Sequence, residues 1–159
     1  MIGKAVLAFM LLPGVVAYAV PLVWIVGAGG RLSVTGGLVL LTVGSACLIW
    51  CVLDFHIAGR GTLAPWAPPT RLVVRGLYRF TRNPMYLAVI LVVVGWAIWS
   101  SMFGLWLYAA GLALGFHLRV VRFEEPTLAR MHPRQWPEYV ASVPRWLWPP
   151  WRLAPRSRK

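Results

Sequence analysis

The residues best suited to binding chemistry lie directly before a long apolar stretch, in the sequence RFTRNPMYL (79–87). Asn83 and Pro84 are typical of a helix start: we expect the Asn83 side chain to accept from a free backbone N–H, and proline has no N–H to leave unpaired. The positive end of that helix, with Arg79 and Arg82 beside it, would suit a carboxylate or a phosphate. The alternative is that these arginines contact lipid phosphates and nothing else.

Two acids, Glu124 and Glu125, stand near the other end of the apolar stretch, just before Pro126. Proline disfavours helical conformation in the residue before it, so we expect the helix to end here. Acids at a helix C-terminus oppose its dipole, at a cost of roughly 0.3–1 kcal/mol each. Either Arg119 and Arg122 offset this cost by local pairing, or the acids are retained to bind a cation.

Two further ionisable residues lie inside apolar runs, where such groups are often functional. His117 precedes Glu124 by two helical turns and is therefore expected on the same helix face. It would either remove a proton from a bound amine or thiol or serve as a hydrogen-bonded structural residue. Asp54 requires a partner, for which Arg60 and His56 are the candidates.

The sequence offers neither a metal site nor a disulfide framework. The three histidines lack the spacing of metal ligands, so we expect no metal. The two cysteines, Cys47 and Cys51, lie one turn apart in an apolar run, where they would pack on one helix face as small hydrophobic residues.

The composition is that of an integral membrane protein. Of the 159 residues, 59% are hydrophobic and 13% are charged. The net charge of +12 also raises the question of nucleic-acid binding. The basic residues, however, flank apolar runs instead of gathering on a soluble segment. We therefore expect membrane lipid, and no nucleic acid, as a partner.

Four apolar segments predict an all-α protein of one domain (1–159) with about four transmembrane helices, since roughly 20 residues cross a bilayer. The last two segments form one long apolar stretch that is interrupted at SSMFG (100–104). Because small residues permit a turn there, we expect a helical hairpin. The predicted spans are residues 5–26, 38–58, 84–99 and 103–122.

The charge distribution predicts the orientation of these spans. Apart from Arg31, every Lys and Arg lies on the side of the two termini. The positive-inside rule places that side in the cytoplasm. The tail (136–153), rich in tryptophan and arginine, is expected to lie in the membrane interface on this side. Three tryptophans are expected to anchor the outer turn in the opposite interface: Trp96, Trp99 and Trp106.

Two motif blocks around the hairpin resemble the isoprenylcysteine carboxyl methyltransferase and phospholipid methyltransferase superfamily of integral-membrane enzymes. The first, GLYRFTRNPMYL (76–87), is similar to the family pattern GxYxxxRHPxY, with Asn83 in the histidine position. The second, EEPTLARMHPRQWPEYVASVPRWLWP (124–149), is similar to EExxLxxxFGxxYxxYxxxVPR. Three residues depart from the second pattern: His132, Pro133 and Trp136.

The resemblance implies transfer of a methyl group from S-adenosylmethionine to a lipophilic acceptor, an isoprenylcysteine-type carboxylate or a related lipid. The reaction would occur at the cytoplasmic face of a bacterial inner membrane, with the cofactor between residues 76–86 and 117–149. Arg82 would lie near the cofactor carboxylate or the acceptor, and we expect it to orient the acceptor because it borders the membrane. Glu125, with Glu124, would bind amino or ribose hydroxyl groups. The residues expected at the cofactor are Tyr78, Arg82, Asn83, Tyr86, Glu124, Glu125, Tyr139 and Arg145, and those expected to be catalytic are Arg82, Glu125 and His117.

Three alternatives stay open at this point. The first is a non-enzymatic membrane protein that retains the fold, although the charges of Arg82 and Glu125 are kept. The second is a methyltransferase that acts on phospholipid amines. The third is a membrane reductase that uses a reduced nicotinamide. The sequence does not determine the acceptor or the oligomeric state.

Overall fold

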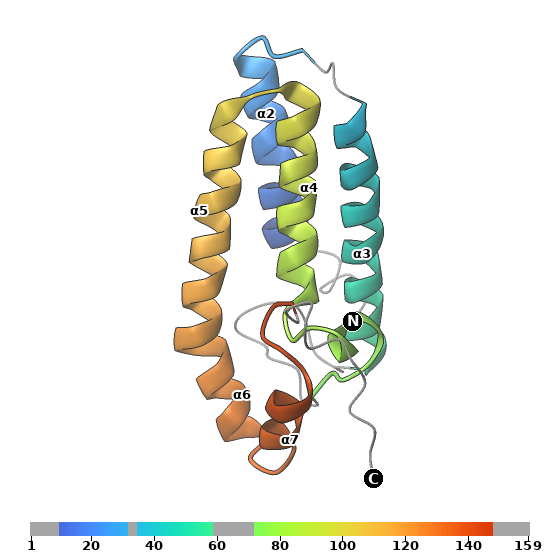
Figure 1. The fold of residues 1–159 in the computed structure, drawn as a ribbon, viewed down its shortest axis with the longest axis vertical. Helices are drawn as coiled ribbons and strands as arrows, with labels where there is room; N and C mark the ends of the chain where they lie inside the picture. Colours follow the sequence, from blue (N-terminus) through green and yellow to red (C-terminus); the bar gives the residue numbers. More distant parts are fainter. Residues whose placement is uncertain (1–9, 32–34, 59–71, 148–159) are drawn as a thin grey trace.

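The computed structural model describes residues 10–31, 35–58 and 72–147, and all regular structure in these ranges is helical. In chain order the elements are η1 (Met10–Ala19), α2 (Val20–Gly27), α3 (Gly36–Ala58), η2 (Gly76–Arg79), α4 (Pro84–Ser100), α5 (Phe103–Arg119), η3 (Val120–Glu124), α6 (Glu125–Met131) and α7 (Gln135–Ser142). The all-α prediction is confirmed for these residues. Helices α2 to α5 lie side by side, with α6 and α7 at the end where α3 ends and α4 begins (Figure 1). We call this the site end.

Two helices are long and apolar enough to cross a membrane. One is Gly36–Asp54 within α3, and the other is the continuous helix Phe103–Met131, made of α5, η3 and α6. Two shorter apolar helices, Pro13–Gly27 and Pro84–Ser100, lie beside them. Residues 5–9 of the first predicted span lie outside the described residues.

The outer faces of the bundle expose large apolar side chains. Val23 is 71% exposed, Val39 63% and Leu107 60%. Water disfavours apolar surface of this extent, whereas lipid tails accept it. The exposed faces therefore agree with a membrane protein.

Helices α3 and α4 pack with their backbones in close contact at three glycines. A Cβ atom on Gly95 would lie 2.7 Å from the Leu41 backbone nitrogen and 2.9 Å from the Gly37 carbonyl oxygen. A Cβ atom on Gly44 would lie 2.8 Å from a Val92 methyl group. Small residues are typical of membrane helix interfaces because they allow such close approach. This contact holds the first half of α3 against α4.

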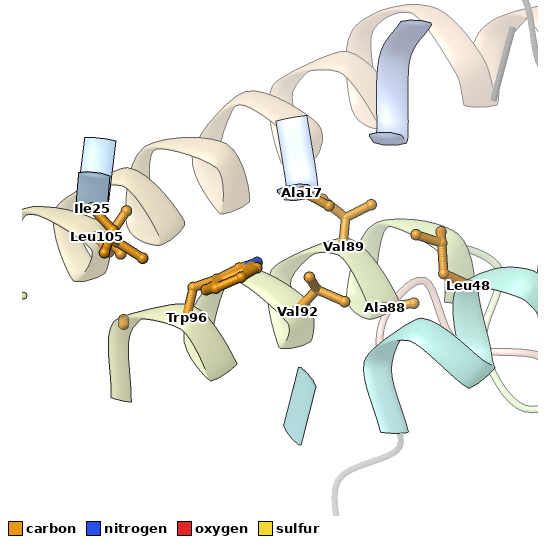
Figure 2. Close-up of a cluster of buried hydrophobic side chains, with 9 residues drawn as sticks. Ala17, Ile25, Leu48, Ala88, Val89, Val92, Trp96 and Leu105 are labelled. Atoms are coloured by element: carbon orange, nitrogen blue, oxygen red, sulfur yellow. The ribbon is translucent and has the colours of Figure 1, made fainter. Parts of the chain in front are cut away.

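Trp96 belongs to the main hydrophobic core and not to an interfacial belt. It is 9% exposed and stacks on Trp99, with 5.5 Å between the ring centroids. The prediction that it anchors the outer turn was wrong, because its face of α4 packs inward against the other helices (Figure 2). Trp106, on α5, is 43% exposed. The buried residues of this core are Ala17, Ile25, Leu48, Ala88, Val89, Val92, Trp96, Ala97 and Leu105.

The hairpin predicted at residues 100–104 is present. Helix α4 ends at Ser100, and its C-cap residue, Ser101, adopts a left-handed conformation with φ of 54°. Its N–H bonds to the Ile98 carbonyl, and α5 begins two residues later at Phe103. The two helices run antiparallel (Figure 1). The start of α4 and the end of α5 consequently meet at the site end.

The helix does not end before Pro126, contrary to expectation. Glu125 is helical (φ −60°, ψ −46°), and the chain continues as α6. The segment η3 is a π-helical turn, a wider turn than in an α-helix, in which the Glu125 N–H bonds to the Val120 carbonyl five residues back. Pro126 therefore falls in the first turn of a new helical segment, α6, where proline is tolerated. The acids therefore lie inside a helix and not at its C-terminus.

Candidate functional site

Two arginines share one carboxylate at the site end, an arrangement called the ionic triad below. Arg145 binds Glu125 with both ends of its guanidinium, Nε to Oε1 and Nη2 to Oε2, each at 2.7 Å. Arg82 Nη1 lies 2.9 Å from Glu125 Oε1. The side chains of Arg82 and Glu125 are 10% and 17% exposed, and that of Arg145 is 35% exposed. The triad joins the first motif block to the second.

The segment that carries Arg82 is held against the chain that follows α7. The Arg82 N–H donates to the Pro144 carbonyl at 2.9 Å. Thr81 Oγ1 and Asn83 Nδ2 both donate to the Arg145 carbonyl, at 3.2 and 2.9 Å. These bonds fix the Arg82 backbone beside Arg145, the second arginine that binds Glu125.

Asn83 is the N-cap of α4 by position, with Pro84 as the next residue, but its side chain forms no capping hydrogen bond. The expected side-chain cap was therefore wrong. The physical reason is the orientation of the side chain: Asn83 Nδ2 donates to a carbonyl 62 residues further along the chain, and this bond turns the amide toward the segment after α7. Asn83 thus connects the start of α4 to the segment after α7.

The pKa values of the two arginines of the triad shift in opposite directions. Burial lowers the pKa of the Arg82 guanidinium; Glu125 opposes this and Arg145 adds to it. The pKa of Arg145 is raised, chiefly by its hydrogen bonds to Glu125. Arginine stays protonated at neutral pH. Two guanidinium groups and one carboxylate then leave one net positive charge at the triad.

Arg82 also carries an unused donor. Its Nε is buried and has no hydrogen-bond partner in the described part of the chain. Its guanidinium carbon lies 5.5 Å from the centre of the Trp136 ring, a cation–π contact. Buried polar atoms are nearly always paired, so this N–H is an unsatisfied donor.

A second network, on α4 and the end of α5, places Tyr86 beside Glu124. The Tyr86 hydroxyl donates to Glu124 Oε1, and Arg119 Nε donates to the same oxygen at 2.7 Å. Residues five apart in a regular α-helix lie about 140° apart around the axis, because each residue turns the helix by about 100°. The wide turn η3 closes that angle and brings Arg119 to Glu124. Local pairing by Arg119, one of the two alternatives for the acids, is present.

Two buried tyrosines connect η2 to α7. The Tyr139 hydroxyl donates to the Tyr78 carbonyl at 2.8 Å, and both residues are buried. Burial raises the pKa of both phenols, while Arg82 opposes the rise at Tyr139. Both phenols are therefore neutral at physiological pH and act as hydrogen-bonding groups rather than as bases.

His117 is exposed and lies apart from the ionic triad. Its Nδ1 accepts a hydrogen bond of 3.3 Å from Trp146 Nε1, and the two rings are 6.3 Å apart. The expectation that His117 shares a helix face with Glu124 assumed a regular helix, and η3 breaks that register. The contact attaches the residue after Arg145 to α5.

The roles of three residues near the site had no signal in the sequence: Trp136, Trp146 and Arg75. Trp136 and Trp146 stood out as interfacial tryptophans, and their contacts with Arg82 and His117 need the folded chain. The partner of Asp54 is Arg75, whose Nε lies 3.0 Å from Oδ1. It is not among the two expected partners: Arg60 lies outside the described residues, as does the side chain of His56.

The comparison with known protein families shows what kind of protein this is. The family model of the phospholipid methyltransferases matches residues 32–135, more than half of the chain. The chain belongs to this family. The resemblance carried by the two motif blocks is confirmed. No curated protein and no solved structure shows a significant match.

Membership of the phospholipid methyltransferase family implies a membrane methyltransferase, and methyltransferases of this kind generally use S-adenosylmethionine. The match covers the pair Arg82–Glu125 and the second network, and it ends at Gln135. Arg145 and α7 lie beyond it. Their place in the site is given by the structure, through the bonds of Arg145 to Glu125.

Proposed function

We propose that this protein transfers a methyl group from S-adenosylmethionine to a lipophilic acceptor at the cytoplasmic face of the membrane. The observation that carries the proposal is the ionic triad, because it joins both motif blocks of the family at one end of the bundle. Methyl transfer is a displacement that depends on positioning two reactants in line. The transfer therefore needs a site that holds both reactants rigidly, and a lipophilic acceptor requires that site to lie close to the bilayer.

The residues at the site end fit this cofactor. Its carboxylate needs a cationic partner, and Arg82 offers a buried Nε–H without a partner in a triad with net positive charge. Glu125 is fully engaged by two arginines, so it would hold them in place rather than bind the ligand directly. Glu124, 31% exposed, is the acid available for the amino or ribose hydroxyl groups. When bound, the cofactor would supply an electrophilic methyl group.

The proposed topology has four spans, with the site end and both termini in the cytoplasm. Four apolar helices support it, two of them shorter than a full span. Among the residues that the structure describes, Arg31 is the one basic residue at the opposite end, while Arg75, Arg79, Arg119 and the triad lie at the site end. This is the asymmetry that the positive-inside rule describes.

The acceptor in this proposal is an isoprenylcysteine-type carboxylate or a related lipid, with a phospholipid amine as the alternative. Incubating membranes with methyl-labelled cofactor distinguishes them, because the label would appear in a base-labile ester of a prenylated species or in a base-stable amine lipid. Label in neither fraction would favour a non-enzymatic protein. Binding of a reduced nicotinamide in place of the cofactor would favour a reductase.

Arg82→Ala is expected to weaken binding of S-adenosylhomocysteine at least about tenfold, or about 1.4 kcal/mol. The physical reason is the loss of the cation and of the unpaired Nε–H. Calorimetry on detergent-purified protein measures the affinity. Arg79→Ala is the matched control, because this substitution removes the same charge from the same segment at a residue that is exposed. Wild-type affinity in Arg82→Ala would contradict the site assignment.

His117→Phe is expected to slow methyl transfer less than about tenfold, because we propose that His117 attaches the tail through Trp146. Removing a general base typically costs about 10²–10⁴ in rate. Single-turnover transfer to membrane acceptors measures the difference. Trp146→Phe removes the same hydrogen bond from the other side and should have an equal effect. A loss of a hundredfold or more in His117→Phe alone would instead make His117 the base.

A further inference from the structure

Asp54 is a buried acid that the proposed methyl transfer does not use. It lies in the last turns of α3, with its side chain 5% exposed. Its Oδ1 pairs with Arg75 Nε at 3.0 Å, whereas its Oδ2 is buried without a hydrogen-bond partner in the described residues. An acid costs several kcal/mol at such a position unless it is paired. A buried charge that is half paired needs an explanation beyond stability.

The backbone of Gly76 lies directly against this carboxylate. Gly76 has φ of +53°, and a Cβ atom there would overlap Asp54 Oδ2 and lie 2.9 Å from its Cγ. The same Cβ would lie 3.0 Å from Trp50 Nε1. Glycine is required here twice over, because other residues rarely adopt this φ and have no room for a side chain. Asp54 thus contacts the first residue of the first motif block.

The chain runs from this contact to Arg82 through two overlapping hydrogen-bonded turns, which together are called the turn below. The Tyr78 N–H donates to the Arg75 carbonyl at 3.0 Å, and the Thr81 N–H to the Leu77 carbonyl at 3.3 Å. Arg82 follows, with its side chain on Glu125. Among the described residues, α3 also contacts this segment through a small apolar cluster that includes Cys51, Val73 and Tyr78.

We infer that Asp54 is a positioning residue for the methyl-transfer site, acting through Arg75 and Gly76 to set where Arg82 meets Glu125. This inference rests on the proposed function for the ligand that it concerns. Apolar contacts are not directional, so the cluster alone would not fix the orientation of the turn. The ion pair, with the Gly76 backbone packed against its carboxylate, fixes both the position and the orientation of the turn. The carboxylate touches no residue of the triad.

The test is Asp54→Asn, which keeps the shape of the side chain and removes its charge. Amide hydrogen exchange of the ligand-free protein in detergent is expected to accelerate at least tenfold in residues 76–83, with α5 unchanged. The affinity for S-adenosylhomocysteine is expected to fall about tenfold. Glu138→Gln, the loss of an exposed acid on α7, is the control and should change neither quantity.

Arg75→Gln removes the same ion pair from its half-exposed side, and its effects should match those of Asp54→Asn even if the latter folds poorly. In an Arg82→Ala background, Asp54→Asn should not weaken binding further, because it acts through Arg82. A merely structural Asp54 would lower the melting temperature and leave the affinity of the folded protein unchanged. That result, or wild-type exchange in residues 76–83, overturns the inference. Exchange is measured without ligand, so a wild-type protein that fails to bind overturns the proposed function separately.

Discussion

Replacing Glu125 by alanine is expected to lower the free energy of unfolding by about 3 kcal/mol, the lower end of the range for breaking a buried ion pair. The loss is large because two guanidinium groups remain beside each other without their carboxylate, and Arg82 is 10% exposed. The lower end applies because Arg145 is 35% exposed and is partly screened by solvent. Denaturant titration in detergent, followed by helical circular dichroism, measures the change. Cofactor affinity should fall with it, since Arg82 is no longer fixed.

Two variants separate the triad from a general effect of acid removal. Glu124→Ala removes an acid whose arginine partner is 43% exposed, so it should cost about 1 kcal/mol or less. Adding Arg82→Leu to Glu125→Ala removes the uncompensated buried charge and should recover about half of the lost stability. A double variant no more stable than Glu125→Ala alone would mean that charge pairing does not hold this site together.

Gly95→Ala is expected to destabilise the protein by about 3 kcal/mol, the upper end of the range for overpacking. The added Cβ would meet the Leu41 backbone nitrogen at 2.7 Å and the Gly37 carbonyl oxygen at 2.9 Å. Backbone atoms cannot rotate away as a side chain does, so α3 and α4 must separate. Thermal unfolding in detergent measures the loss. Because α3 also holds Asp54, the separation should weaken cofactor binding as well.

Gly111→Ala on α5 is the matched control, because a Cβ atom there meets nothing within 4 Å. Alanine favours a helix over glycine by roughly 0.5–1 kcal/mol, so this variant should be neutral or slightly more stable. If Gly95→Ala and Gly111→Ala behaved alike, the close contact between α3 and α4 would not be a determinant of stability.

The sequence predicted the helical class, the hairpin and the family because these depend on local patterns. Apolar runs, the pair Asn83–Pro84 and the small residues at the turn act within a few residues of themselves. The family resemblance also named Arg82, Glu125 and Arg145. It did not show that both arginines bind the same carboxylate, because that requires knowing which segments meet.

Two of the wrong predictions, those for Asn83 and Trp96, share one physical cause, which is contact with partners distant in the sequence. The Asn83 side-chain oxygen was expected to cap its own helix, and the side chain is instead oriented by its nitrogen, which donates to the Arg145 carbonyl. Trp96 was expected in an interface, and it is buried by helices that the local pattern does not place. Local propensity determines which contacts a residue can form. Which of them it forms depends on the free energy of the tertiary contacts that compete with the local ones.

The sequence by itself determined that this is a helical membrane protein of the phospholipid methyltransferase family. Composition and motif spacing can be read from the chain without knowing how it folds. The tertiary structure alone decided how the charges pair. Glu125 lies between Arg82 and Arg145 because the segment before α4, the start of α6 and the segment after α7 converge at one end of the bundle. A buried charge pairs with whichever opposite charge lies close to it in the folded protein. The packing of the helices determines which residue that is.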